Sequence, residues 1–212
     1  MTLTDLTPVL DAVLRPWCER LARHGFTAGM VTVAGTLLCL GVGALVAAAQ
    51  GPWFLMLLAL LTLLARAAAC RLSTLLAEEH CKGSAVGTLL REVGGLVSET
   101  ALCWPLATVR GMDARLVTLC CLLALLTEFA GTVVSSIGAT RRDDGPMDAT
   151  ARAWALGALC LLLGVGVGPG WWTSVWFQVL PFLLGWTMIR RLRGALAEVG
   201  PPTQGADPTG AE

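Results

Sequence analysis

Residues 53–76 read WFLMLLALLTLLARAAACRLSTLL, an apolar stretch long enough to cross a lipid bilayer. A spanning helix needs roughly 20 mostly apolar residues. In lipid the backbone must satisfy its own hydrogen bonds, which makes an α-helix the expected structure. The stretch therefore predicts a membrane-spanning helix, and Arg66 and Arg71 are unusual charges within it.

Similar apolar segments lie on both sides of this stretch. Together with it they predict spans over 30–49, 53–76, 84–108, 115–138, 153–168 and 172–189. We therefore expect an all-α polytopic membrane protein, with six transmembrane helices in a membrane domain over 29–193. This domain is expected to follow a cytoplasmic segment over 1–28 and to precede a disordered, Pro/Gly-rich tail over 194–212.

The composition excludes an ordinary soluble protein. Hydrophobic residues make up 55% of the chain and charged residues only 14%, whereas soluble domains carry about 25% charge. The formal net charge is zero, so no overall charge points to nucleic acid as a partner, and the apolar spans lead us to expect membrane lipids instead. The eight cysteines include no C-x-x-C pair, which favours apolar packing residues over a disulfide framework or a zinc site.

Lysine and arginine are distributed unequally between the two sides of the predicted bundle. With six spans, one side carries only Arg110 and Arg115. The other side carries Arg15, Arg20, Arg23, Lys82, Arg141, Arg142, Arg152, Arg190, Arg191 and Arg193. The positive-inside rule therefore predicts that both termini are cytoplasmic.

Apolar residues recur at helical spacing over 6–22, with Arg15, Glu19 and Arg20 among them. This pattern predicts an amphipathic helix that lies in the membrane interface ahead of the first span. Packing of this helix against its own protein is an equal alternative, and both can hold.

Charged residues cluster inside the second and third spans, where a charge is costly and indicates a function. At helical spacing Arg66 and Cys70 share one face of the second span. Arg91, Gly95 and Glu99 share one face of the third. The sequence therefore predicts that polar stripes of two neighbouring helices face each other.

Over about 15–193 the chain resembles the CDP-alcohol phosphatidyltransferase family. The flanking segments Leu14-Arg15-Pro16, Gly25-Phe26-Thr27-Ala28 and Thr127-Glu128-Phe129-Ala130-Gly131 carry much of the resemblance. The family signature reads D-x-x-D-G-x-x-A-R, then a short spacer, then G-x-x-x-D-x-x-x-D. Laid on this chain without gaps, its four aspartate positions hold Cys70, Ser73, Arg91 and Gly95, and its other positions hold Thr74, Ala77, Glu78 and Gly87.

The resemblance implies a transfer of a phosphatidyl group from a CDP-linked lipid to an alcohol. In active members the aspartates hold two divalent metal ions, Mg²⁺ or Mn²⁺, and the last aspartate acts as a base. The resemblance also implies a bacterial inner-membrane location, a CDP-lipid as ligand, and a homodimer or a heterodimer with an active paralogue.

The changed signature positions argue against this activity. Hard cations need oxygen ligands, and the side chains of Cys70 and Gly95 offer none. Arg91 would place a fixed positive charge beside a dication, a repulsion of several kcal/mol at about 4 Å. We therefore expect no metal cofactor and a catalytically degenerate protein, linked to phospholipid biosynthesis as a lipid-binding or partner subunit.

Two other functions stay open: an active phosphotransferase with displaced carboxylates, and a lipid transport or binding protein without chemistry. The candidates for a residual polar site are Glu79, Glu92, Glu99, Glu128, Arg141 and Arg152. Pairing with arginines is favoured over metal ligation for Glu92 and Glu99, and pairing between helices is favoured for Glu128. Because the charges at Glu78 and Arg91 are exchanged relative to the signature, we also predict a salt bridge between them.

Overall fold

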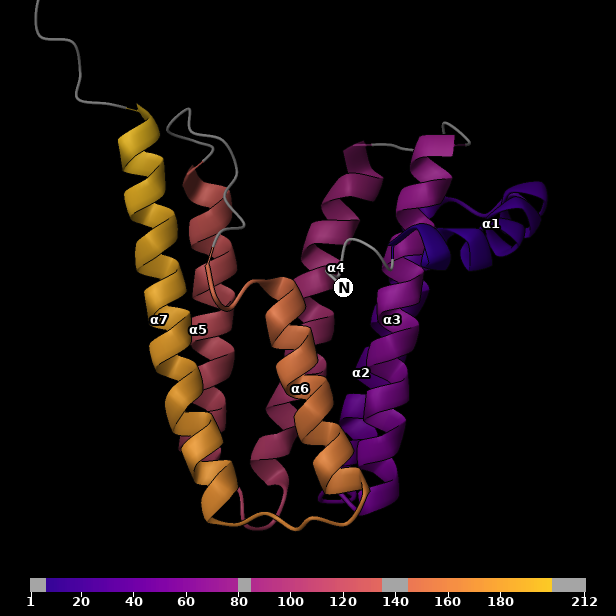
Figure 1. Cartoon of the computed structure of the whole chain (residues 1–212). Helices are drawn as coiled ribbons and strands as arrows, with labels where there is room; N and C mark the ends of the chain where they lie inside the picture. The colour runs from indigo at the N-terminus through magenta and orange to yellow at the C-terminus, as the bar shows by residue number, and fades with distance from the viewer. Residues whose placement is uncertain (1–6, 80–84, 135–144, 200–212) are drawn as a thin grey trace, which may run out of the picture.

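The computed structural model describes residues 7–79, 85–134 and 145–199, with side chains over 11–78, 86–134 and 145–198. These residues form seven α-helices and one 3₁₀-helix (Figure 1). Each predicted span contains one α-helix, the third also contains the 3₁₀-helix, and the predicted N-terminal helix is present. In chain order the elements are α1 (Thr7–Arg23), α2 (Ala28–Ala48), α3 (Trp53–Glu79), α4 (Ala85–Cys103), η2 (Trp104–Thr108), α5 (Ala114–Val133), α6 (Ala149–Gly164) and α7 (Trp171–Val199).

Three helices in the described part of the chain are long and apolar enough to cross a membrane. They are α2, α3 and α5, and α6 is a shorter apolar helix. The all-α class and the membrane character are therefore confirmed. The count of six spans stays a prediction, because α4 carries three charged residues and α7 mixes apolar with polar residues.

The helices α2 to α7 run alongside one another, and α1 projects sideways from one end of the bundle (Figure 1). The helix α2 packs against both α3 and α4, whereas α5 packs against α7. The helix α6 packs against α3, and α5 contacts α4 and η2. The bundle thus has one half made of α2, α3, α4 and α6 and another made of α5 and α7, and the two halves meet where α5 contacts α4 and η2.

Several element boundaries differ from the predicted ones, and two of the differences change the interpretation of the sequence. The helix α7 continues to Val199, well past the predicted end of the sixth span at residue 189. Arg191, expected in a cytoplasmic segment, is therefore part of this helix and is only 1% exposed. The α-helical part of α4 ends at Cys103, and a 3₁₀-helix with Pro105 in its first turn continues the segment, since proline lacks the N–H that an α-helix interior needs.

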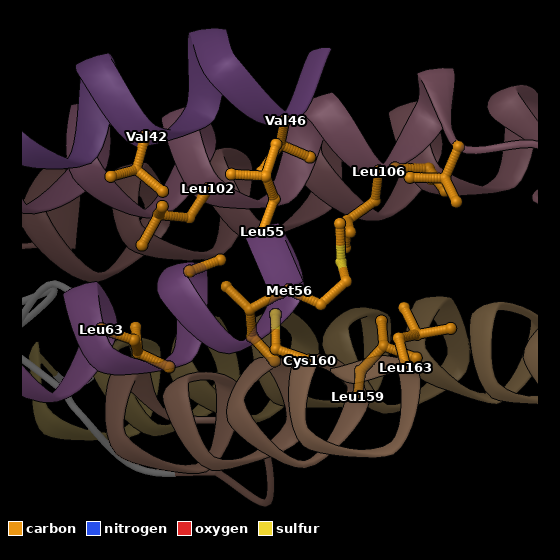
Figure 2. Packing of buried hydrophobic residues seen from close by; sticks show 14 of the residues in the cluster. Val42, Val46, Leu55, Met56, Leu63, Leu102, Leu106, Leu159, Cys160 and Leu163 are labelled. Atoms are coloured by element: carbon orange, nitrogen blue, oxygen red, sulfur yellow. The ribbon is translucent and has the colours of Figure 1, made fainter. Parts of the chain in front are cut away.

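Aliphatic side chains fill the space between α2, α3, η2 and α6 (Figure 2). Val46 of α2, Met56 of α3 and Leu159 of α6 are each no more than 2% exposed. Cysteines take part in this packing, as the sequence predicts: the buried free thiols are Cys18, Cys39, Cys120, Cys121 and Cys160. The core therefore joins the two halves of the bundle with apolar side chains.

The helices α2 and α4 approach closely enough for their backbones to touch. A Cβ atom added to Gly43 would collide with the carbonyl oxygen of Ala101. A Cβ atom on Gly94 would lie 2.8 Å from Oγ1 of Thr36. Small residues permit such an approach between membrane helices, so these two glycines hold α2 and α4 in close contact.

The helix α1 packs on its own protein and also leaves apolar residues outside. Cys18 is fully buried in a cluster with Ala28, Leu75 and Leu76. Trp17 on the other face is 56% exposed. The packing alternative is therefore confirmed for α1, and its exposed apolar face agrees with an interfacial position.

A bidentate ion pair connects α1 to α3. Nε of Arg71 donates to Oδ1 of Asp11 at 2.8 Å, and Nη2 donates to Oδ2 at 2.7 Å. This hydrogen bonding favours the charged carboxylate and lowers the pKa of Asp11 below its usual value. Because the lowered pKa belongs to the folded state, the pair stabilises the protein above the unfolded pKa of about 3.9 and loses its effect as pH falls through the folded pKa.

We therefore predict a pH-dependent effect of Asp11→Asn on thermal unfolding in detergent. The variant should unfold at a lower temperature than the wild type at pH 7. The difference should shrink as the pH falls below about 3.9 and vanish once the pH is below the lowered folded pKa of Asp11. Glu19→Gln, at an exposed carboxylate of the same helix, serves as the control and should change little. A difference that persists at low pH would contradict the ion-pair explanation.

Candidate functional site

A small polar pocket lies where α2, α3 and α4 meet. Its lining includes Thr32 and Thr36 of α2, Arg66 and Cys70 of α3, and Arg91, Gly95 and Ser98 of α4. None of its lining residues in the described part of the chain is an aspartate or a glutamate. The polar groups that face this pocket are therefore two guanidinium groups, hydroxyls and a thiol.

Hydrogen bonds across the pocket join α3 and α2 to α4. Nη2 of Arg66 donates to the carbonyl oxygen of Gly95 at 3.2 Å. From α2, Oγ1 of Thr36 donates to the carbonyl oxygen of Gly94 at 3.4 Å. Within α4, Oγ of Ser98 donates to the same oxygen at 2.6 Å. The predicted facing of polar stripes on α3 and α4 is thus confirmed at Arg66 and Gly95.

The structure brings together three of the four aspartate positions of the signature. Cys70, Arg91 and Gly95 line the pocket. The fourth, Ser73, is buried on α3, where its hydroxyl donates to the carbonyl oxygen of Cys70 at 2.8 Å. The spacing of the signature therefore identifies residues that converge in space.

The remaining signature positions lie outside the pocket lining. Thr74 donates to the carbonyl oxygen of Cys70 at 3.1 Å, and Ala77 packs against the cluster that holds α1. Gly87 lines a separate groove with Gly29 on α2. None of these three positions presents a polar side chain to the described lining of the pocket.

The predicted salt bridge between Glu78 and Arg91 is wrong. In the described part of the chain no ion pair joins them. Arg91 lines the same pocket as Cys70, so it lies level with Cys70 along the bundle. Glu78 lies two turns further on, about 12 Å along the helix axis at 1.5 Å per residue, and its side chain is exposed.

A second polar cluster is centred on Arg152 of α6. Its Nε donates to Oε1 of Glu99 at 2.5 Å, and its Nη2 donates to Oε2 of the same carboxylate at 3.0 Å. Nη2 also donates to Oε1 of Glu128 at 2.9 Å. The side chain of Arg152 is only 5% exposed, so these contacts join α4, α5 and α6 inside the bundle.

Arg191 extends this cluster to α7. Its Nη1 donates to the carbonyl oxygen of Thr127 at 2.9 Å and to Oε1 of Glu128 at 3.3 Å. Glu128 therefore lies between two arginines from different helices. The predicted pairing of Glu99 with an arginine and of Glu128 between helices is confirmed.

The other candidates for a residual polar site are distributed differently. Glu92 is half-buried on α4 and is not among the residues that line the pocket. The side chain of Glu79 and the whole of Arg141 lie outside the described residues. Of the six candidates, the structure brings together Glu99, Glu128 and Arg152.

Sequence reasoning left two arginines out of the site. Arg66 is not a signature position, although its helical spacing from Cys70 placed it on the same face. Arg191 stands beside Arg190 and Arg193 and was counted only as a cytoplasmic charge. The sequence holds no signal for its burial, since its partner Glu128 is 63 residues away along the chain.

The donor set of the pocket does not fit the divalent metal ions that the resemblance implies. Mg²⁺ and Mn²⁺ prefer carboxylate and carbonyl oxygens. The pocket offers no carboxylate in its described lining, and two of its lining side chains are cationic. Elsewhere in the described chain, no group of three or more His, Cys, Asp or Glu side chains could hold a metal ion.

The sequence is similar to that of a known bacterial inner membrane protein. No family model matches the sequence. The chain is 33% identical over 198 residues to the inner membrane protein YnbA of Escherichia coli (strain K12), and the match covers 92% of this chain and 97% of that protein.

Two solved structures have a similar fold. Both are phosphatidylinositol phosphate synthase (PgsA1) of Mycobacterium tuberculosis, a CDP-alcohol phosphatidyltransferase. The structure in complex with manganese and citrate has a TM-score of 0.70 and 18% identity, over 85% of this chain and 87% of that one. The structure with CDP-DAG bound has a TM-score of 0.68 and 19% identity, over 85% and 92%. The fold that the resemblance implies is therefore confirmed.

The cluster around Arg152 predicts a large loss of stability when its centre is removed. Breaking a buried ion pair from one side costs about 3–5 kcal/mol, so Arg152→Met should lower the free energy of unfolding in detergent by about 3 kcal/mol. The double variant Arg152→Met/Glu99→Gln should lose less stability than Arg152→Met, because a neutral amide then replaces the carboxylate that would be left without its partner. Arg193→Met, at an exposed arginine of α7, is the control, and an equal effect of both methionine variants would contradict the buried role.

Proposed function

This chain belongs to the family of the inner membrane protein YnbA, and from that premise we propose that it is a non-catalytic, lipid-binding inner membrane protein of phospholipid metabolism. Its fold is that of a CDP-alcohol phosphatidyltransferase, PgsA1. It would be a pseudoenzyme: the fold is kept, and the transfer of a phosphatidyl group is lost.

The pocket between α2, α3 and α4 carries this proposal. PgsA1 was crystallised with manganese, whereas Arg66 and Arg91 line the pocket of this chain and no described lining residue is acidic. A dication about 4 Å from one guanidinium would be repelled by several kcal/mol at an effective dielectric near 20. Carboxylate ligands normally offset such a charge, and here they are not part of the described lining.

The proposal also accounts for the carboxylates that a displaced active site would need. Glu99 is held by Arg152 through two hydrogen bonds. Glu78 is exposed at the far end of α3. Neither lines the pocket, so the structure gives less support to an active phosphotransferase with displaced carboxylates.

Lipid binding is the part of the family role that survives a lost metal site. A PgsA1 structure holds CDP-DAG, which supports the proposal that this fold accommodates a diacyl lipid in the present chain also. As a partner subunit, the chain would form a homodimer, or a heterodimer with an active paralogue. It requires no nucleic acid for this role.

We further propose that α2 to α7 all cross the membrane and that both termini are cytoplasmic. The C-terminal ends of α3, α5 and α7 lie at the same end of the bundle as α1 (Figure 1). The exposed arginines Arg20 and Arg193 belong to α1 and to the last turns of α7. Their shared end agrees with the positive-inside rule.

The lost activity can be tested with purified protein, CDP-diacylglycerol, Mn²⁺ and a panel of alcohols. We predict no release of CMP above a protein-free control and no saturable binding of Mn²⁺, because the pocket has fixed positive charge in place of ligands. Native mass spectrometry of the same preparation should show bound lipid and reports any dimer or co-purified lipid enzyme. Release of CMP that depends on enzyme and metal would overturn the proposal.

The orientation can be tested with fusions that report on which side of the membrane they lie. A green fluorescent protein at the C-terminus should fluoresce, because it folds in the cytoplasm. Alkaline phosphatase inserted at Gly111, in the turn between η2 and α5, should be active, because it requires the periplasm. Active phosphatase at the C-terminus would place the termini on the opposite side.

A further inference from the structure

The two arginines of the pocket differ from the other buried and half-buried arginines whose ion pairs are described. Arg71 pairs with Asp11, and Arg152 and Arg191 both pair with Glu128. By contrast, the described residues give neither Arg66 nor Arg91 a carboxylate within ion-pair distance. A charge among membrane helices is costly unless it is paired. An anion other than the described carboxylates would therefore stabilise the two arginines of the pocket.

Both guanidinium groups have N–H donors that are not used in hydrogen bonds within the described chain. A guanidinium carries five N–H groups, and Arg66 uses one of them on the carbonyl oxygen of Gly95. Within the described chain, the guanidinium group of Arg91 makes no hydrogen bond to an acceptor. The planar arrangement of these donors matches the oxygens of a phosphate group and binds them through charge-assisted hydrogen bonds.

The other polar groups of the pocket neither neutralise the two arginines nor repel an anion bound to them. The hydroxyls of Thr36 and Ser98 already donate to carbonyl oxygens of the helices. None of the described lining residues carries a negative charge. The electrostatic preference of the pocket therefore comes from the two arginines alone.

The size of the pocket limits what enters it. Its free volume is about 20 Å³, which is room for roughly one water-sized group. A space of this size admits one oxygen of a phosphate group, and the phosphorus and the other oxygens would remain outside it. A nucleotide base or ribose is far too large, so the ligand is recognised by its phosphate.

We infer that Arg66 and Arg91 bind a phosphate oxyanion directly, in place of the metal ions that the fold's active members use, and so hold the phosphate of a membrane lipid. This inference rests on the proposed non-catalytic function and gives its lipid a chemical class. A phosphate-bearing lipid and a free phosphate compound offer the same oxygens, so the experiment must separate the two sources.

The test measures binding to the purified full-length protein in a phosphate-free detergent with EDTA present. The probes are a short-chain phosphatidic acid, the diacylglycerol with the same chains, and inorganic diphosphate. We expect phosphatidic acid to bind about tenfold or more tightly than diacylglycerol, since hydrogen bonds to charged groups supply that difference. Binding of diphosphate alone, without phosphatidic acid, would keep the phosphate site and assign it to a soluble ligand.

Variants locate the site. Arg66→Gln and Arg91→Gln should each weaken phosphatidic acid binding about tenfold or more, and Arg91→Lys should retain part of it because the charge is kept. Arg115→Gln, at an exposed arginine near the start of α5, should have no effect. Size-exclusion profiles and thermal unfolding show whether each variant is folded. If Arg91→Gln does not fold, the binding measured for Arg91→Lys takes its place.

Three results would overturn the inference: equal binding of phosphatidic acid and diacylglycerol with no binding of diphosphate, unchanged binding by the Arg66→Gln/Arg91→Gln double variant, or binding only when Mn²⁺ is added. The failure of the proposed function has a different signature, which is release of CMP from CDP-diacylglycerol. Loss of phosphate selectivity without CMP release removes this inference alone.

Discussion

A guanidinium group held between apolar helices needs negative charge beside it, and Arg152 shows how this protein meets that requirement. Its side chain reaches Glu99 on α4 and Glu128 on α5, and Glu128 in turn contacts Arg191 on α7. Four helices are therefore joined by one connected set of opposite charges. A buried ion pair adds little net stability compared with apolar packing, but losing one member is costly. Its main effect is to restrict how α4, α5, α6 and α7 can be placed relative to one another.

The pocket between α2, α3 and α4 departs from that pattern. Arg66 and Arg91 carry the same guanidinium group as Arg152 but are half-buried rather than buried, and no described carboxylate lies at ion-pair distance from either. Under the inference drawn above, the missing negative charge belongs to a ligand. Fixed cations would then supply the attraction for phosphate in a fold whose PgsA1 representative was crystallised with manganese.

The sequence predicts the helices well and the relations between them only in part. Length and hydropathy locate every helix from α2 to α7, since a spanning segment depends on local composition alone. The signature spacing groups Cys70, Arg91 and Gly95 correctly. It fails for Glu78 and Arg91, because spacing along one helix does not state how far its neighbour is shifted along the bundle. It also fails for Arg191, whose burial depends on a partner in another helix.

The ion pair between Glu99 and Arg152 spans 53 residues of sequence, and this separation has a consequence for biosynthesis. A ribosome that adds about 5–20 residues per second delivers Glu99 several seconds before Arg152. During that interval α4 has a carboxylate without its later partner, in a segment that is already the most charged of the predicted spans. If α4 crosses the membrane as proposed, its buried carboxylate gains its partner only when α6 emerges, and a chain truncated before α6 would lack the arginine that neutralises Glu99.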